Sequence, residues 1–131
     1  MQLLVEILLV VVLPFAGVLL HELLHYSFGW AFGGGPYFNK WTLIVPYQVD
    51  YETPKEMSNI QTKITGGAIL LFPFTLAIVL ALTAPGNIVD RLPLIAFLMG
   101  GSIVSDLDLL AVLQPEKWKK WTNGEPISRS D

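Results

Sequence analysis

Two histidines and a glutamate stand together in the segment His21-Glu22-Leu23-Leu24-His25, at the end of a long apolar run. Residues four apart lie on one face of an α-helix, so His21 and His25 can direct ring nitrogens at a single ion. Glu22 is near enough to accept a proton from a metal-bound water. This H-E-x-x-H pattern is typical of zinc hydrolases. It predicts Zn²⁺ bound by His21 and His25 with Glu22 as the catalytic base, and the competing interpretation is a helix end with two hydrogen-bonded histidines.

A third protein ligand must be a carboxylate, because the chain has no cysteine and no histidine outside this pattern. Asp106 and Asp108 occur late in the third apolar segment, where a carboxylate is costly unless it is paired or bound to a cation. Asp106 is the deeper of the two, and the small residues before it let one helix approach another closely. Residues two apart on a helix point about 200° apart. We therefore predict that Asp106, not Asp108, completes the metal site, unless Gly100-Gly101 marks an unwound stretch.

Composition and hydropathy indicate a membrane protein of one domain. The 131 residues are 53% apolar and 15% charged, against about 25% charged in soluble domains. Residues 3–20, 64–84 and 92–113 are each apolar and long enough for a spanning helix. We predict an all-α integral membrane fold with three transmembrane helices in a core over residues 1–113, followed by a C-terminal tail over residues 114–131. The net charge of −3 provides no basic surface for nucleic acid.

The connection between the first two spans, residues 26–61, contains a short stretch of β composition. Residues 41–45 and 47–51 have strand composition and are separated by Pro46, which favours an edge strand or a bend. The first of these segments follows the proposed metal site closely in sequence. It could pair with an unwound substrate by β-addition, or it could simply lie in the membrane interface. The residues that would bind substrate are Trp41, Leu43, Ile44 and Val45.

The distribution of basic residues predicts how the chain crosses the cell membrane. With three spans, the first connection and the tail share one side, and every lysine and arginine except Arg91 falls in them or, for Lys63, at the edge of the connection. Because cytoplasmic loops carry the excess of positive charge, this multi-pass chain is expected to have its N-terminus outside and its C-terminus in the cytoplasm. All four tryptophans and all four tyrosines belong to the same two regions. The metal site then falls in the cytoplasmic half of the bilayer.

A histidine motif at the cytoplasmic end of one span, with an aspartate on a later span, resembles the site-2 protease family of intramembrane zinc metalloproteases. His21, Glu22 and His25 match the first motif of that family. The family's N-P-x-x-D-G motif has no counterpart here, since no Asn-Pro precedes Asp106 or Asp108. The segment from Gly101 to Asp106 resembles instead the G-S-x-x-D-type segment of small membrane zincins related to that family. The resemblance implies zinc-dependent proteolysis within a three-helix core.

These observations predict a zinc metallopeptidase that hydrolyses peptide bonds of transmembrane or membrane-associated protein substrates. Zinc lowers the pKa of its water to about 7, and Glu22 would accept the proton and return it to the leaving amine. Two other functions stay open. One is a catalytically inactive, zinc-stabilised membrane adaptor, which should survive substitution of Glu22. The other is a small transport or channel subunit that uses Asp106 as an ion site.

Overall fold

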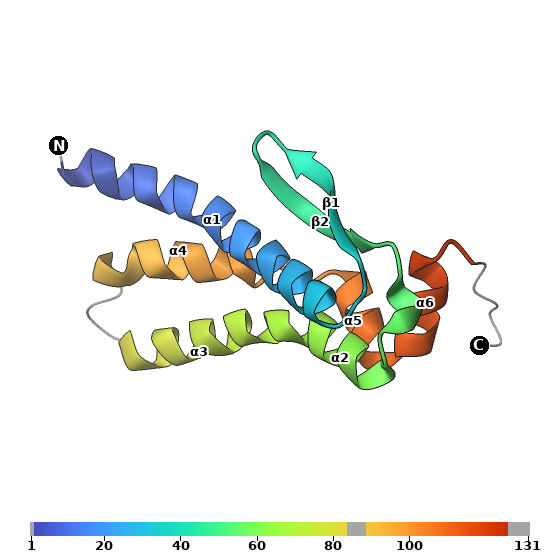
Figure 1. The fold of residues 1–131 in the computed structure, drawn as a ribbon. Helices are drawn as coiled ribbons and strands as arrows, with labels where there is room; N and C mark the ends of the chain where they lie inside the picture. The colour runs from blue at the N-terminus through green and yellow to red at the C-terminus, as the bar shows by residue number, and fades with distance from the viewer. Residues whose placement is uncertain (1, 84–88, 126–131) are drawn as a thin grey trace. The chain divides into compact units, whose positions relative to one another are not determined.

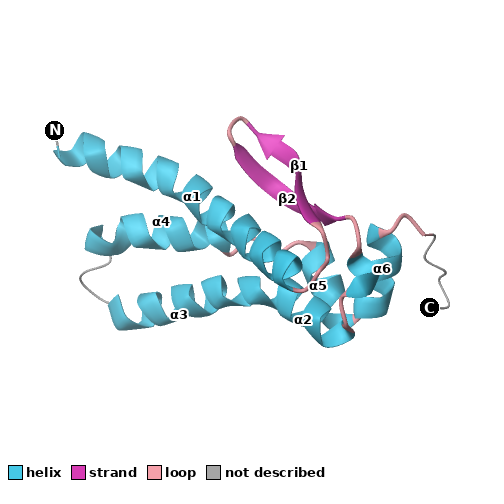
Figure 2. Cartoon of the chain, viewed as in Figure 1, coloured by secondary structure: helices cyan, strands magenta, loops and turns pink. Residues whose placement is uncertain are grey.

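The computed structural model describes residues 2–83 and 89–125, and most of the described residues are helical (Figures 1 and 2). The end of the predicted tail, including Arg129, lies outside this part of the chain. Contacts divide the chain into two compact units. The first unit comprises Met1–His21 and Ile69–Ile103, and the second comprises Glu22–Ala68 and Val104–Asp131.

The first unit is held together by unusually close contacts between helices. Helix α1 (Gln2–Ala31) meets α4 (Leu92–Gly101) backbone to backbone. A Cβ added at Gly17 would lie 2.0 Å from the carbonyl oxygen of Phe97, and one added at Gly100 would lie 2.0 Å from that of Pro14. Neither position can therefore hold a larger residue without moving a helix. Helix α3 (Leu71–Thr83) runs beside α4 (Figure 1), after the 3-10 turn η2 (Ala68–Leu70). The 3-10 turn η3 (Val89–Arg91) leads into α4.

The second unit contains a β-hairpin made of β1 (Pro36–Thr42) and β2 (Val45–Tyr51), which pair antiparallel (Figure 2). Leu43 and Ile44 form the turn, and Leu43 has a φ of 53°, in the left-handed region that non-glycine residues rarely adopt. The sequence correctly indicated β structure here, but it placed the break at Pro46. Pro46 instead lies within β2, opposite Trp41. A proline is tolerated there because both strands of a two-stranded sheet are edge strands.

Three short helices and a 3-10 turn complete the second unit. The 3-10 turn η1 (Pro54–Glu56) precedes α2 (Asn59–Gly67), which begins with a capping box between Ser58 and Gln61. Helix α5 (Asp106–Leu113) begins with a second capping box, and α6 (Pro115–Thr122) follows it almost directly. The hairpin, the end of η1, α5 and α6 share a core formed by four buried side chains. They are Tyr51, Met57, Ala111 and Trp118.

Two helical stretches among the described residues are long and apolar enough to cross a membrane. They are Leu3–Ala31 and Asn59–Thr83, and a third is added if α4 and α5 count as one span that is bent at a short break. Large apolar side chains are exposed along α1 and α3, as expected for surfaces that face lipid. The mostly helical fold with a small β element is therefore confirmed. The number of three transmembrane helices stays a prediction.

Candidate metal centre

His21 and His25 lie one turn apart on α1, as their spacing predicted. The division between the two units falls between His21 and Glu22, inside this unbroken helix, so the helix sets the spacing of the two histidines. All three side chains of the motif are buried, with exposed fractions of 5% for His21, 7% for Glu22 and 6% for His25. Buried polar groups are costly unless they are hydrogen-bonded or bind an ion. The partners of these side chains therefore decide what the motif can do.

Each histidine ring is oriented by a backbone carbonyl. The Nδ1 of His25 lies 2.8 Å from the carbonyl oxygen of Thr65 on α2, and the Nδ1 of His21 lies 2.8 Å from that of Gly101 on α4. A carbonyl only accepts hydrogen bonds, so each Nδ1 carries the proton. In the neutral ring, the Nε2 lone pair is then the one that can bind a metal. Such carbonyl contacts are the usual outer-shell support of metal-binding histidines.

Asp108 supplies the carboxylate of the site. Its Oδ1 lies 3.0 Å from the Nε2 of His25. Its Oδ2 accepts hydrogen bonds from the backbone N–H of Ser105, at 2.7 Å, and from the Ser105 hydroxyl, at 2.8 Å. Asp108 is the N3 residue of the α5 capping box, and Ser105 is its N-cap. One carboxylate oxygen thus anchors the helix start while the other meets the histidine.

His21, His25 and Asp108 form a group that could hold a metal ion. Each offers one ligand atom, and these atoms lie within 4.8 Å of one another. Two imidazole nitrogens and one carboxylate oxygen match the donor set of a catalytic zinc site, in which a fourth position is left for water. Ligand atoms on a tetrahedral zinc lie about 3.3 Å apart, and the His25–Asp108 distance of 3.0 Å is close to that value. The donor chemistry therefore fits zinc.

The structure brings Asp108, and not the predicted Asp106, into this group. Asp106 is the first residue of α5 and its side chain is exposed. The rotation between the two aspartates holds within α5, but the face that each presents was judged from one continuous third helix, whereas α4 ends at Gly101 and α5 begins only at Asp106. The sequence did hold a signal for Asp108. Ser105 and Asp108 form the S-x-x-D pattern of a capping box before an apolar run, which turns the second aspartate back toward the helix start.

Glu22 is positioned by the hairpin rather than by its own helix. Its carboxylate accepts a hydrogen bond from the backbone amide of Val49 on β2. Tyr51, further along β2, donates its hydroxyl to the backbone carbonyl of His25 at 3.2 Å, and its ring packs edge-on against Trp118. Burial raises the pKa of the Tyr51 phenol well above its usual range, so this hydroxyl remains a donor. Sequence patterns gave no sign of these supports, because they depend on tertiary contacts.

The predicted substrate-binding residues lie at and beside the turn that joins β1 to β2. Trp41 is at the end of β1 and Val45 begins β2. Leu43 and Ile44 form the turn, with exposed fractions of 93% and 87%. The segment is therefore a hairpin tip and not the single strand that its composition suggested. Its role in binding substrate stays a prediction.

Comparison of the chain with models of known protein families, with curated proteins and with solved structures found no match.

Proposed function

We propose that this chain is a zinc-dependent intramembrane peptidase, similar in mechanism to site-2 proteases. One observation carries the proposal: two helix-spaced histidines and an aspartate gather their ligand atoms within 4.8 Å, with Glu22 between the histidines. A simple structural His–Asp pair would account for His25 and Asp108. It would leave unexplained why a second histidine joins the group and why a glutamate is buried beside it.

Each residue of the site would have a separate role in the reaction. When bound, zinc supplies an acidified water and polarises the scissile carbonyl. His21, His25 and Asp108 would hold the ion, and the carbonyls of Thr65 and Gly101 would keep both rings in the required tautomer. Glu22 would accept the proton from water and deliver it to the leaving amine.

The membrane environment favours a membrane protein as the substrate. The histidine motif belongs to Leu3–Ala31, which is itself long and apolar enough to span the bilayer. A soluble polypeptide has no reason to enter such a site, whereas a transmembrane segment reaches it by lateral movement. A peptide bond must first leave its helix to be attacked, and the edge strands of the hairpin could pair with the extended segment.

Metal analysis of the purified full chain tests the proposal together with a Glu22→Gln variant. We expect about one zinc per chain in both proteins, because glutamine at this position leaves the three ligands in place. Hydrolysis of a single-span reporter peptide should fall about 100-fold or more in the variant, as expected for loss of a general base.

The same experiment separates the peptidase from a zinc-stabilised adaptor. An adaptor would retain zinc and show no hydrolysis in either protein. A chain that binds no zinc at stoichiometric levels, or a Glu22→Gln variant with undiminished turnover, would overturn the proposed chemistry.

A further inference from the structure

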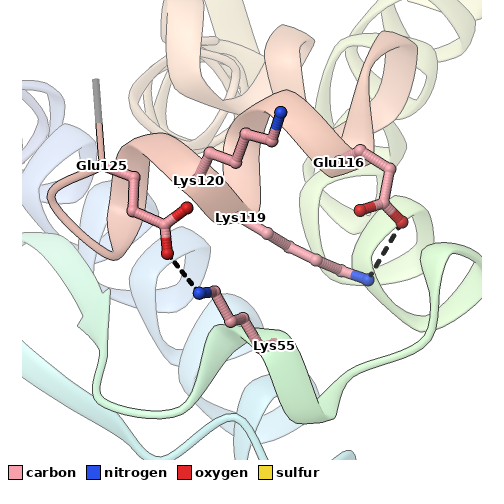
Figure 3. A pocket seen from close by; sticks show the side chains of 5 residues that line it. All are labelled: Lys55, Glu116, Lys119, Lys120 and Glu125. Carbon is pink, nitrogen blue, oxygen red and sulfur yellow. Dashed lines mark hydrogen bonds and ion pairs between the residues drawn. The ribbon is translucent and has the colours of Figure 1, made fainter. Parts of the chain in front are cut away.

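A second polar site occurs in the second unit, formed by α6, η1 and Glu125, three residues after the end of α6. A cavity of about 370 Å³, partly open to the surface, is lined there by charged side chains (Figure 3). Three lysines and two glutamates form its lining, so the cavity carries a net charge of +1. The lining residues are Lys55, Glu116, Lys119, Lys120 and Glu125.

Lys119 is the buried cation of this cavity, with an exposed fraction of 8%. Its ammonium donates to the side-chain oxygen of Asn59 at 2.8 Å and lies 3.7 Å from the carboxylate of Glu116. A buried ammonium is costly unless its hydrogens are satisfied. Because it has three N–H donors, Lys119 can bind a further acceptor in the cavity while it keeps both of these partners. The contact with Asn59 also holds the ammonium in place.

The wall of the cavity opposite Lys119 is formed by an ion pair that an incoming anion can separate. Lys55 pairs with Glu125, and about half of each side chain is exposed (Figure 3). Lys55 holds the pKa of the Glu125 carboxyl below its usual value, so this carboxylate stays charged at neutral pH. Exposed ion pairs contribute only about 0–1 kcal/mol, so an incoming anion can replace Glu125 on Lys55 at little cost.

The cavity lies where a phospholipid headgroup would be. Asn59, which Lys119 contacts, is the first residue of the candidate span Asn59–Thr83. The start of a span lies at the boundary between hydrocarbon and headgroups. Trp121 on α6 is also partly exposed, as is common at that boundary. Lysine clusters at this level are the usual sites for anionic lipid headgroups.

We propose that this cavity binds a phosphate-type anion, the phosphodiester of an anionic phospholipid, through Lys119, Lys55 and Lys120. The ammonium of Lys119 is the fixed part of the site. Lys55 exchanges its bond with Glu125 for a bond with the phosphate, because lysine binds phosphate as a compact point charge. The site is separate from the metal centre and shares no residue with it.

Isothermal titration of the purified full chain in a neutral detergent tests this assignment. The probes are dihexanoyl phosphatidylglycerol, dihexanoyl phosphatidylcholine and inorganic phosphate. We expect phosphatidylglycerol to bind more tightly than phosphatidylcholine. Tighter binding of phosphatidylglycerol than of inorganic phosphate identifies a lipid as the source of the anion. Equal or tighter binding of inorganic phosphate identifies a soluble phosphate compound at the same site.

Two substitutions in the Lys55–Glu125 pair should change the affinity for the anionic probe in opposite directions, and both leave the buried Lys119 unchanged. Lys55→Gln should weaken binding about tenfold, the effect of losing one charged hydrogen bond. Glu125→Gln should strengthen binding, because it removes the carboxylate that competes for Lys55. Lys63→Gln is the matched control, since Lys63 is exposed on α2 and does not line the cavity. The proposal is wrong if no probe binds, or if Lys55→Gln has no larger effect than Lys63→Gln.

Discussion

Hydrogen bonds hold the side chains of the candidate metal site in place. His25 on α1 is oriented by a carbonyl of α2, and Asp108 on α5 by the backbone and hydroxyl of Ser105. Glu22 is held by an amide of β2. Such outer-shell contacts are typically worth about 10–100-fold in metal affinity or activity. The positions of these side chains are therefore fixed by hydrogen bonds as well as by the helices that carry them.

The choice between the two aspartates gives a sharp test at the scale of single residues. Asp108→Asn removes the charge that meets His25 but keeps an oxygen for the Ser105 amide, so α5 should still be capped. We expect it to weaken zinc binding by more than about 100-fold, beyond the effect of an outer-shell change. Asp106→Asn, the same change on an exposed neighbour, should bind zinc like the unaltered chain. Competition with a fluorescent zinc chelator measures both, and loss of zinc from the Asp106 variant alone would restore the original assignment.

The approach of α5 to α2 decides whether the carboxylate reaches the histidine. A Cβ added at Gly66 would lie 2.6 Å from the Cβ of Ala111 and 3.1 Å from the backbone oxygen of Asp108. Contacts this close require one helix to move. At the adjacent Gly67 the nearest atom would be 3.5 Å away, an ordinary van der Waals contact. The helix pair therefore depends on one glycine and not on the other.

Gly66→Ala and Gly67→Ala form a matched pair that tests this helix contact. Each substitution should raise the free energy of unfolding by about 0.5–1 kcal/mol, because alanine reduces the backbone freedom of the unfolded chain. Only Gly66→Ala should also lower the free energy of unfolding, by about 1–3 kcal/mol, because the added methyl group overpacks the helix contact. This variant should bind zinc more weakly because Asp108 is displaced. Thermal unfolding in detergent and zinc titration measure the two effects. Equal behaviour of the variants would show that the packing of α2 on α5 does not position the ligand.

The hairpin tip allows substrate binding to be tested without disturbing the metal. Leu43→Asn with Ile44→Asn removes two exposed apolar side chains, and asparagine tolerates the positive φ found at Leu43. Folding and zinc content should be unchanged, whereas hydrolysis of a single-span reporter should fall several-fold, roughly the loss of two apolar contacts. Unchanged hydrolysis would assign the tip to the membrane interface alone. A proline substitution at Leu43 would not serve, because proline requires a negative φ.

Local patterns predicted some elements of this molecule well and missed others for a physical reason. The histidine motif, the apolar stretches and the β composition depend on residues near one another in sequence, and they correctly indicated a mostly helical fold with a small β element. The break between α4 and α5 depends on whether residues 102–105 form helical backbone hydrogen bonds or the capping bonds that start a new helix. Hydrophobic periodicity does not distinguish the two. The prediction of Asp106 rather than Asp108 rested on a continuous helix across this break. The support of Glu22 by Val49 lies beyond any local pattern, because it joins residues on different elements.

For the whole molecule, a membrane location would explain features of the surface that are unfavourable in water. Large apolar side chains are exposed along the candidate spans, and charged residues are concentrated in the first connection and the tail. In water, contiguous apolar surfaces of this kind lead to association. In a membrane, the same surfaces face hydrocarbon, and the lysines and aromatic rings remain at the boundary. The distribution of side chains thus agrees with the candidate spans that length and hydropathy indicate.

The orientation of the chain gives the last prediction. With three spans, the first connection lies in the cytoplasm and the turn that contains Asp90 lies outside, because the basic residues other than Arg91 share one side. The chain has no cysteine, so Lys40→Cys and Asp90→Cys each introduce a single thiol at an exposed position. A membrane-impermeant maleimide added to intact cells should label the Asp90 variant, and it should label the Lys40 variant only after lysis. The reverse pattern would invert the orientation, and labelling of both from one side would mean that Asn59–Thr83 does not cross the membrane.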